Sequence, residues 1–479
     1  MKVPRLAIAL IAVSASLLPL ASAGALSAPK AAKLKLPTPN AGLNQGYLPF
    51  QSCSSLGNCS VTGIYIGAHS YSAGVIETEV KGVWRAPLGV TPPPGYSAAK
   101  GVTMEGLACP SDGDCVALGQ YAASSNLLPF AETEFAGEWQ RSVAVSLPAN
   151  AATTSESSTP HAIACATAGD CTVVGTYTTN AATSSTEGFI ATETRGVWHR
   201  ALELGLPANA NSNPLVSLAQ VTCWTSVSCV AVGSYIDSNN VSRAVVVTKV
   251  AGLWKRAQAL GLPGNASAFA GAQFNEVGCT ATGSCLAAGT FNTFTGAVQP
   301  LVALSVDGVW DRALQISLPD RATNPEALLY GFKGVACAST GNCALGGQFL
   351  DKSGHYQGFL DNVVNGVIER AHVLALPAGA VQAGHNGGVV SVSCPGVGTC
   401  VAGAAYQDAS KKYVAFLVGE VHDVWSPGVT IALPGTSTTV GVAGGIYSVQ
   451  CFTALTCQVT GSYESSPSHY DGFSLVTGT

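Results

Sequence analysis

Residues 221–235 read Val-Thr-Cys-Trp-Thr-Ser-Val-Ser-Cys-Val-Ala-Val-Gly-Ser-Tyr, which is two apolar segments joined by a short polar turn between two cysteines. The arrangement occurs eight times, and successive first cysteines lie from 56 residues (Cys53 to Cys109) to 58 residues (Cys165 to Cys223) apart. Such a period is typical of four-stranded repeats, whereas helical hairpins and leucine-rich turns are shorter. The repeat therefore decides the architecture of the chain.

Each repeat begins with two strands joined by a hairpin. Glycine, serine, threonine and aspartate recur between the two cysteines, and these residues favour a turn. Four residues after the second cysteine stands a glycine, replaced once by Ala404, and six residues after it an aromatic residue. Because glycine admits a neighbouring backbone and the ring fills the adjacent space, we expect the aromatic residues to pack inside rather than to stack on a ligand. They are Tyr65, Tyr121, Tyr177, Tyr235, Phe291, Phe349, Tyr406 and Tyr463.

Two further strands follow in each repeat. A variable stretch leads to a third strand, such as residues 188–193, and to a tight turn with glycine two residues before tryptophan, as in Gly196 and Trp198. A fourth strand is predicted after the tryptophan, ending at Leu206-Pro207 in this repeat, because proline is tolerated on an outer strand. Four antiparallel strands per repeat without a helical pattern predict an all-β fold, an eight-bladed β-propeller.

The two ends of the chain complement each other. The last repeat ends after its third strand, at residues 472–476, and lacks a fourth. Lys33-Leu34-Lys35-Leu36-Pro37 resembles a fourth-strand ending, and Leu36 precedes Cys53 by 17 residues, as Leu206 precedes Cys223. We expect this N-terminal strand to complete the last blade and close the ring, which removes an exposed sheet edge.

The N-terminus predicts export. Lys2 and Arg5 precede an apolar stretch over residues 6–20 and an Ala-Ser-Ala end, so residues 1–23 are interpreted as a signal peptide. Residues 24–32 are then a flexible leader and residues 33–479 a single propeller. No later apolar run reaches the roughly 20 residues of a membrane span. We expect a protein that is secreted, or periplasmic or extracellular, without a membrane span.

An exported chain with an even number of cysteines favours disulfides over metal ligation. Because each cysteine pair lies within one repeat, the expected disulfides are local: Cys53 with Cys59, Cys109 with Cys115, Cys165 with Cys171, Cys223 with Cys229, Cys279 with Cys285, Cys337 with Cys343, Cys394 with Cys400 and Cys451 with Cys457. The eight histidines follow no repeat, so no metal site is predicted.

Composition restricts the partners. Charged residues make up 10% of the chain, the net charge is -5, and Lys plus Arg total 22, so the basic surface that nucleic acids select is not expected. No cofactor is predicted, and a monomer is expected.

The order of strands assigns the loops to two faces. The cysteine hairpins and the Gly-x-Trp turns emerge on one face, named here the disulfide face. The variable segments between the second and third strands, and the crossings between blades, emerge on the other, the variable face. Variable loops on a rigid scaffold commonly bind ligands, although loops are also polar simply because water surrounds them. The candidate binding residues on this face are His69, Tyr71, Asp237, Arg243, Asp351, His355, Tyr356, Asp408, His469 and Tyr470; no catalytic residue is predicted.

Two further features have structural interpretations. Arginines recur one or two residues after the tryptophan position, and glutamates such as Glu79 and Glu193 recur on the preceding strand, which predicts cross-strand ion pairs. Trp224 lies inside a cysteine hairpin, where local packing is favoured over contact with a partner.

Ser305-Val306-Asp307-Gly308-Val309-Trp310 resembles the Asp-box of sialidase-like propellers, Ser/Thr-x-Asp-x-Gly-x-x-Trp, in a shorter form. Residues 192–198 retain its threonine, glycine and tryptophan without the aspartate. In that family the box is a structural turn, so the resemblance implies only the fold. The chain after residue 23 also resembles uncharacterised secreted bacterial proteins built from Cys-paired propeller repeats, and this resemblance brings no activity with it.

Three functions remain open from the sequence. The first is a secreted scaffold that binds a glycan, a protein or a cell-envelope component through the variable face. The second is a glycan-cleaving hydrolase or lyase of sialidase-like architecture, which requires convergent charged groups at the centre of the ring. The third is a structural surface protein.

Overall fold

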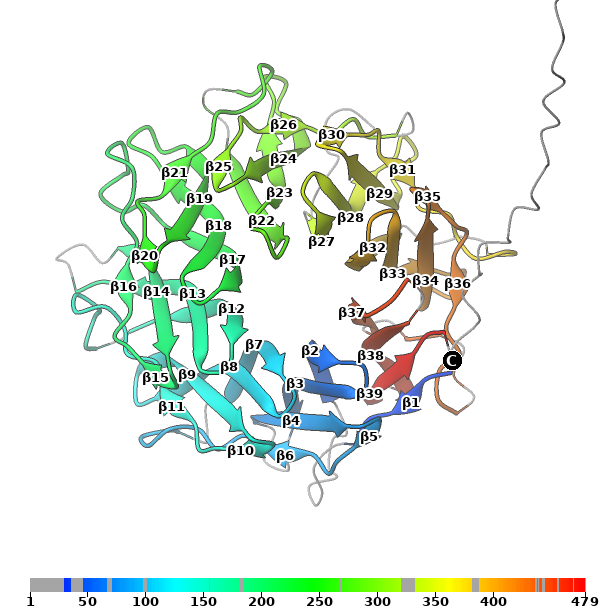
Figure 1. The fold of residues 1–479 in the computed structure, drawn as a ribbon, viewed down its shortest axis with the longest axis horizontal. Coiled ribbons are helices and arrows are strands. Elements are labelled where there is room, and N and C mark those ends of the chain that lie inside the picture. Colours follow the sequence, from blue (N-terminus) through cyan, green and yellow to red (C-terminus); the bar gives the residue numbers. More distant parts are fainter. Residues whose placement is uncertain are drawn as a thin grey trace, which may run out of the picture.

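The computed structural model describes residues 30–35, 46–66, 71–97, 101–154, 156–180, 185–267, 269, 271–319, 332–380, 387–435, 437, 439–441, 444–454, 456–467 and 469–478. These residues form eight blades of antiparallel strands arranged in a ring (Figure 1), which confirms the predicted eight-bladed propeller.

Blade 1 consists of β2 (Gly46–Ser55), β3 (Asn58–Ile66), β4 (Ser72–Val80), β5 (Val83–Trp84) and β6 (Leu88–Gly89). Blade 2 consists of β7 (Val102–Ser111), β8 (Asp114–Ala123), β9 (Asn126–Phe135), β10 (Glu138–Trp139) and β11 (Val143–Ala144). Blade 3 consists of β12 (Thr159–Thr167), β13 (Asp170–Thr178), β14 (Thr186–Thr194), β15 (Val197–Trp198) and β16 (Leu202–Glu203). Blade 4 consists of β17 (Ser217–Thr225), β18 (Ser228–Ile236), β19 (Ser242–Val250), β20 (Leu253–Trp254) and β21 (Gln258–Ala259).

Blade 5 consists of β22 (Ala272–Cys279), β23 (Cys285–Asn292), β24 (Val298–Val306), β25 (Val309–Trp310) and β26 (Leu314–Gln315). Blade 6 consists of β27 (Phe332–Ser339), β28 (Asn342–Leu350), β29 (Tyr356–Val364), β30 (Val367–Ile368) and β31 (His372–Val373). Blade 7 consists of β32 (Gly387–Gly396), β33 (Thr399–Gln407), β34 (Tyr413–Val421), β35 (Val424–Trp425) and β36 (Val429–Thr430). Blade 8 consists of β37 (Gly445–Cys451), β38 (Cys457–Ser466), β39 (His469–Val476) and β1 (Ala32–Lys33).

All eight expected disulfides are formed, each within its own hairpin. The paired Cα atoms lie 3.9 to 4.1 Å apart across the first two strands of each blade. Eight intrachain disulfides fit a protein of an oxidising, non-cytoplasmic compartment. Among the described residues no helix has the length and apolar character needed to cross a bilayer.

The fourth strand differs from the prediction, because it is split into two short pieces and ends before the Leu-Pro pair. In blade 3 both β15 and β16 pair with β14. Between them the N–H of Ala201 turns away and donates to the carbonyl of Ser146, in the outer segment of the preceding blade, at 2.8 Å. Pro207 then begins a turn, since its carbonyl accepts the N–H of Ala210 at 3.1 Å. The interruption therefore exchanges a contact within the sheet for one between blades.

The repeated glycine and aromatic residue pack as expected. A Cβ on Gly233 would lie 1.9 Å from the carbonyl oxygen of Ser217 on the innermost strand, so only glycine allows this approach. The ring of Tyr235 is fully buried between blades, against Val174 and Leu218. The core is thus a series of layers, each made from two neighbouring blades, rather than one central mass.

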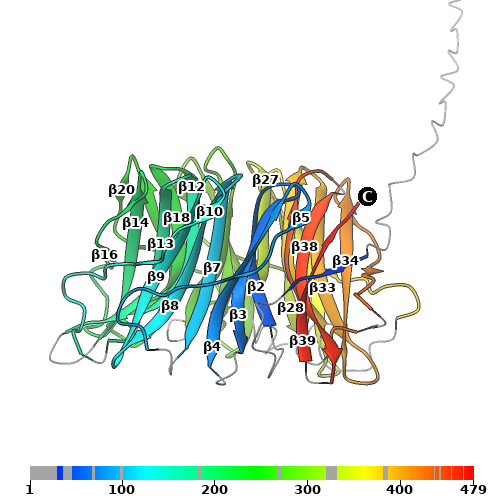
Figure 2. The ribbon, with the colours of Figure 1, turned by 90° about the horizontal axis from the view of Figure 1, so that it is seen from below.

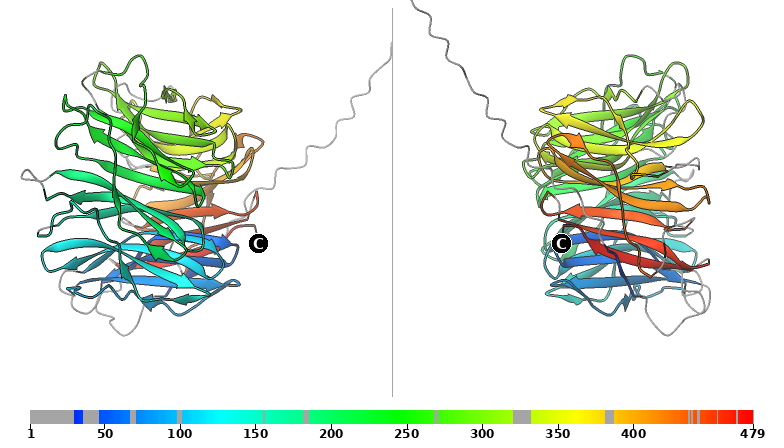
Figure 3. Two further views of the ribbon diagram at one scale, coloured as in Figure 1. Left: turned by 60° about the vertical axis from the view of Figure 1, so that its left-hand side comes forward. Right: turned by 90° about the vertical axis from the view of Figure 1, so that its right-hand side faces the viewer.

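The N-terminal strand closes the ring, as predicted. Ala32 and Lys33 pair with Ser474 and Phe473 on β39. Leu34 is buried against Leu48 and Val75 of blade 1, so the segment joins the last blade (red) to the first (blue), which lie side by side in Figure 3. Leu36 and Pro37, part of the predicted strand, lie outside the described residues, as does the predicted signal peptide.

Figure 2 shows the two faces of the ring, with the strand-joining turns at its upper and lower ends. The hairpin and Gly-x-Trp turns of one blade contact each other directly, because the N–H of Gly196 donates to the carbonyl of Gly169 at 2.9 Å. The second turns and crossings therefore lie together at the opposite end, as the predicted division into faces requires.

Candidate ligand-binding site

Asp237 organises the loop that joins β18 to β19. Its Oδ1 accepts the backbone N–H groups of Asn239 and Val241 at 2.9 and 3.0 Å, and its Oδ2 accepts the Nε of Arg243 at 2.7 Å. Asn240 has a positive φ of 61°, which completes the tight turn. Burial tends to raise the pKa of Asp237, but the hydrogen bonds from Val241, Arg243 and Asn239 hold the pKa below its usual value.

The same loop recurs in blades 6 and 7. Oδ1 of Asp351 accepts the N–H groups of Ser353 and His355 at 2.8 and 3.0 Å. Oδ1 of Asp408 accepts those of Ser410 and Lys412 at the same two distances. The three predicted aspartates thus hold their own loops and orient the side chains that follow them.

A cleft of about 500 Å³ opens on the outer side of blade 4, towards blade 5. Its walls come from β18, β19, β21, the crossing at residues 260–267, and Arg312 of blade 5. The cleft exists because β21 pairs with only Val245 and Val246 of β19, which leaves Arg243 and Ala244 beyond the end of the outer strand. Its size lies within the usual range for small-ligand sites.

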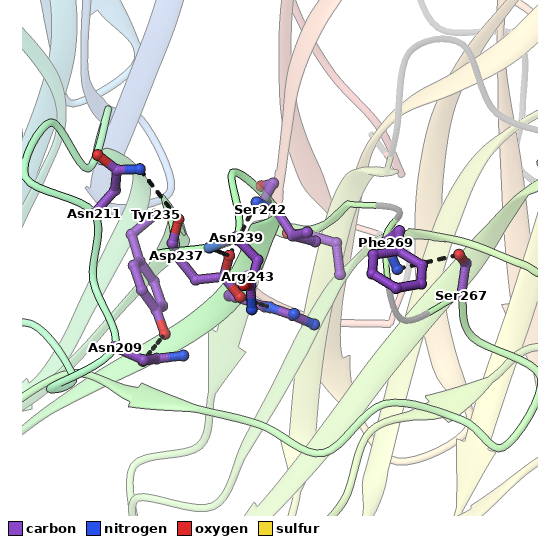
Figure 4. Close-up of polar contacts among 11 residues, drawn as sticks. Asn209, Asn211, Tyr235, Asp237, Asn239, Ser242, Arg243, Ser267 and Phe269 are labelled. Carbon is purple, nitrogen blue, oxygen red and sulfur yellow. Dashed lines mark hydrogen bonds and ion pairs between the residues drawn. The ribbon is translucent and has the colours of Figure 1, made fainter.

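Polar groups of the cleft are held in place by their neighbours (Figure 4). Tyr235 pairs directly with Arg243 across the two strands, and its hydroxyl donates to Oδ1 of Asn209 at 2.8 Å. The ion pair with Asp237 fixes Arg243, whose side chain is 25% exposed. Burial raises the pKa of Tyr235, so the phenol stays protonated. Arg243 is therefore a preorganised cation in the cleft wall.

A second cation lines the cleft, and two exposed phenylalanines lie next to the crossing that forms one of its walls. The guanidinium group of Arg312 donates to the carbonyl of Leu262 through Nε at 2.7 Å. Phe269 and Phe294 are 86% and 70% exposed. Their backbone N–H groups donate to Ser267 and Asn265 in the crossing, so both phenylalanines lie beside that segment. Among the described residues that line the cleft there is no carboxylate.

A second group of polar side chains lies on the innermost strands near the variable face, and is named here the axial arc: Tyr447, Tyr47, Glu105 and His161. In every blade the innermost strand has a register shift at this level, and Glu105, His161 and Tyr447 are the extra residues of their strands. The rings of Tyr47 and Tyr447 meet edge to face, with centroids 4.9 Å apart. Burial raises the pKa of Glu105 and of Tyr47, and the Glu105 charge raises that of Tyr47 further. The arc holds one carboxylate.

The other predicted residues lie in loops of separate blades. The structure brings together Asp237 with Arg243, and Asp351 with His355, whose Nδ1 lies 3.9 Å from Oδ2. Tyr71 of blade 1 is exposed, and Nδ1 of His469 in blade 8 lies 3.0 Å from the carbonyl oxygen of Pro467. Tyr356 and Tyr470 are partly buried at the starts of β29 and β39, and His69 lies outside the described residues.

The predicted arginine–glutamate pairs are wrong. Tryptophan lies opposite each glutamate on the hairpin, as for Glu79 with Trp84 and Glu193 with Trp198. These glutamates, with Glu134 and Glu420, are buried between blades and form no ion pair with an arginine within the described part of the chain. Burial raises the pKa of Glu134, Glu193 and Glu420 to about 7. Tryptophan rather than arginine therefore lies opposite these carboxyl groups, although the charge of Arg85 in the neighbouring blade partly offsets the raised pKa of Glu134.

Trp224 packs locally, as the sequence favoured. Its indole lies over Gly283 in the hairpin of the next blade, where an added Cβ would come within 2.8 Å of the ring. Over the described ranges, no group of three or more His, Cys, Asp or Glu side chains is arranged to hold a metal ion.

Comparisons with known proteins extend only to the fold. No family model matches the chain, and no curated protein sequence matches it. A Dyadobacter fermentans protein of unknown function is similar at 11% identity and a TM-score of 0.38, over 78% of this chain and 93% of that one. A Hadza microbial sialidase is similar at 10% identity and a TM-score of 0.37, over 84% of this chain and 73% of the sialidase chain. The NanB sialidase from Streptococcus pneumoniae is similar at 10% identity and a TM-score of 0.37, over 93% of this chain and 70% of the NanB chain. The resemblance to sialidase propellers is distant.

Proposed function

We propose that this protein is a secreted propeller that binds a carboxylate-bearing saccharide in the cleft between blades 4 and 5. The observation that carries the proposal is that Arg243 and Arg312 both line a cleft in which no described lining residue is a carboxylate. Guanidinium groups bind carboxylates through paired, charge-assisted hydrogen bonds. The exposed rings of Phe269 and Phe294 offer apolar faces beside the cleft, which suit the C–H faces of sugar rings.

Binding is favoured over sialidase-like cleavage because that chemistry uses a tyrosine nucleophile and a carboxyl group together with clustered arginines at the centre of the ring, and the axial arc includes no arginine. The axial arc offers Glu105 with two tyrosines, and the cleft offers cations. A purely structural role does not account for a preorganised Arg243 in the wall of a cleft. The Asp237 loop, which holds that arginine, instead supports a recognition role.

The proposal is tested with trigalacturonic acid, an oligosaccharide that carries a carboxylate on each sugar, by isothermal titration calorimetry. Arg312→Ala is expected to weaken binding about tenfold or more, since hydrogen bonds to charged groups contribute about 1.5 to 3 kcal/mol. Arg256→Ala is the matched control, because Arg256 follows its tryptophan by the same two residues and lies outside the cleft. Maltotriose, which is neutral, is expected to bind far more weakly. Equal affinity for the acidic and neutral sugars contradicts the proposal.

A further inference from the structure

The disulfide face carries a ring of exposed aliphatic side chains. They occupy one repeat position, directly after the second turn residue, in six blades, and are named here the apolar ring: Val83, Val197, Leu253, Val309, Val367 and Val424. Their exposed fractions lie between 59% and 71%. In blade 2 this position is Glu138, but Phe135 across the same turn is 67% exposed. The apolar character of the turn is therefore repeated around the ring.

Neighbouring turns extend this surface. Leu56, Val227 and Val397 are exposed at the tips of the disulfide hairpins. Each hairpin tip contacts the turn of its own blade, as the hydrogen bond from Gly252 to the carbonyl of Val227 shows. Exposed apolar residues scattered singly are ordinary, but here they recur at one position of successive blades on one face, and apolar surface gathered on one face commonly marks an interface. The face is thus suited to contact with another apolar surface.

Exposed charges around the apolar ring divide it into two halves. At or after the turns of blades 1 to 4 the exposed charged residues are one anion, Glu138, and the cations Lys81, Arg85, Arg141, Arg195, Arg200, Lys255 and Arg256. At or after those of blades 5 to 7 stand the anions Asp307, Asp311, Glu369 and Asp423 and the cation Arg370, while Arg312 turns its guanidinium group into the cleft. Asp112, Asp114 and Asp170, in the hairpins of blades 2 and 3, reduce the positive excess without reversing it. One half of the face is therefore basic and the other acidic.

We propose that the disulfide face is an interface between two copies of this chain, packed face to face. A two-fold axis in the plane of the face, along the boundary between the halves, places the basic half of each copy on the acidic half of the other. Under this symmetry blade 4 faces blade 5, so Lys255 and Arg256 lie opposite Asp307 and Asp311 of the second copy. The same patch then serves both copies, as a two-fold interface requires, with a ring of apolar side chains and a rim of charges beside it.

The arrangement differs from the monomer expected from the sequence and leaves the cleft between blades 4 and 5 accessible. The exposed side chains of the apolar ring are removed from water in the dimer, which is the main driving force for such association. The charged rim selects the relative rotation of the two copies, because other rotations bring like charges together.

Sedimentation equilibrium of the mature protein, residues 24–479, tests the proposal. We expect twice the chain mass for the parent protein, and the mass of a single chain for Leu253→Asp with Val309→Asp. Leu202→Asp with Leu314→Asp is the matched control, since these leucines are 56% and 50% exposed on β16 and β26, at the outer edges of blades 3 and 5, and its mass is expected to stay doubled. Thermal melting of each variant establishes that it folds.

A charge exchange separates this pairing from other associations. Lys255→Glu with Arg256→Glu is expected to weaken the dimer, and adding Asp307→Lys with Asp311→Lys in the same chain is expected to restore it. A parent protein that is monomeric up to about 100 μM, well above the micromolar range of weak specific dimers, overturns the proposal. A dimer that survives the apolar-ring substitutions also overturns the proposal. So does a variant with all four charge exchanges that remains monomeric.

Discussion

Deleting residues 30–35 is expected to lower the melting temperature by about 5 to 10 °C, because this segment completes blade 8 and contacts blade 1. Burial of Leu34, with 1% of its surface exposed, contributes about 1.5 to 3 kcal/mol. The N–H groups of Ala31 and Leu34 donate to the carbonyls of Ala432 and Gly472 at 2.8 and 2.9 Å, and each such bond adds about 1 kcal/mol. Deletion also exposes the edge of β39, which favours aggregation.

Differential scanning calorimetry of the truncated protein measures this effect. Leu34→Asp is expected to act in the same direction without shortening the chain. Leu88→Asp is the control, because Leu88 is 48% exposed on the outer strand of blade 1 and its replacement is expected to change stability by about 0.5 kcal/mol or less. A truncated protein that melts like the parent shows that the ring is stable without this strand.

Stability is expected to fall as the pH rises from 5 to 8. Burial raises the pKa of Glu77, Glu132, Glu134, Glu187, Glu193 and Glu420 to about 7, and that of Asp361 to about 8. In the unfolded chain these groups release their protons near pH 4, whereas in the folded protein they retain them. The folded state therefore binds more protons over this interval, and the free energy of unfolding decreases with pH until the groups have titrated.

Melting temperatures at pH 5 and pH 8 test this expectation. We expect the protein to melt several degrees higher at pH 5 than at pH 8. Glu134→Gln and Glu193→Gln are expected to reduce the difference, because glutamine keeps the shape of the side chain and does not ionise. At lower pH the trend reverses, since the pKa values of Asp237 and Asp351 are lowered and their contribution is lost as the pH falls through them. Equal melting temperatures at pH 5 and 8 contradict the burial of these carboxyl groups as acids with raised pKa values.

Much of the fold follows from the repeat, because the spacing of cysteine, glycine and aromatic residue reports one strand geometry used eight times. The split fourth strand does not follow, since it depends on a hydrogen bond from Ala201 to Ser146 in another blade. Trp198 lies opposite Glu193 because of the register of a two-residue strand, which the sequence does not show. The sequence analysis paired arginine with glutamate by their spacing alone, and it therefore assigned Glu193 the wrong partner.

Part of the candidate site follows from the sequence and part does not. Asp237 and Arg243 stand in a variable loop, and the recurrence of aspartate two residues before serine or asparagine in blades 4, 6 and 7 signals the loop that the structure shows. The contribution of Arg312 cannot be seen in the sequence, because it lies 69 residues after Arg243 and occupies a position that carries arginine in other repeats. The axial arc has no residue type that recurs through the repeats, since only Tyr47 and Tyr447 match, so the register shifts of the innermost strands reveal it.

The central claim is that a ligand binds in the cleft on the outer side of blade 4, beside the Asp237 loop of the variable face. Hydrogen–deuterium exchange of the mature protein, with and without trigalacturonic acid, measures this most directly. Slower exchange confined to residues 237–243 and 260–267 is the expected result. Protection at the disulfide hairpins, with these two segments unchanged, would place recognition on the opposite face and contradict the account.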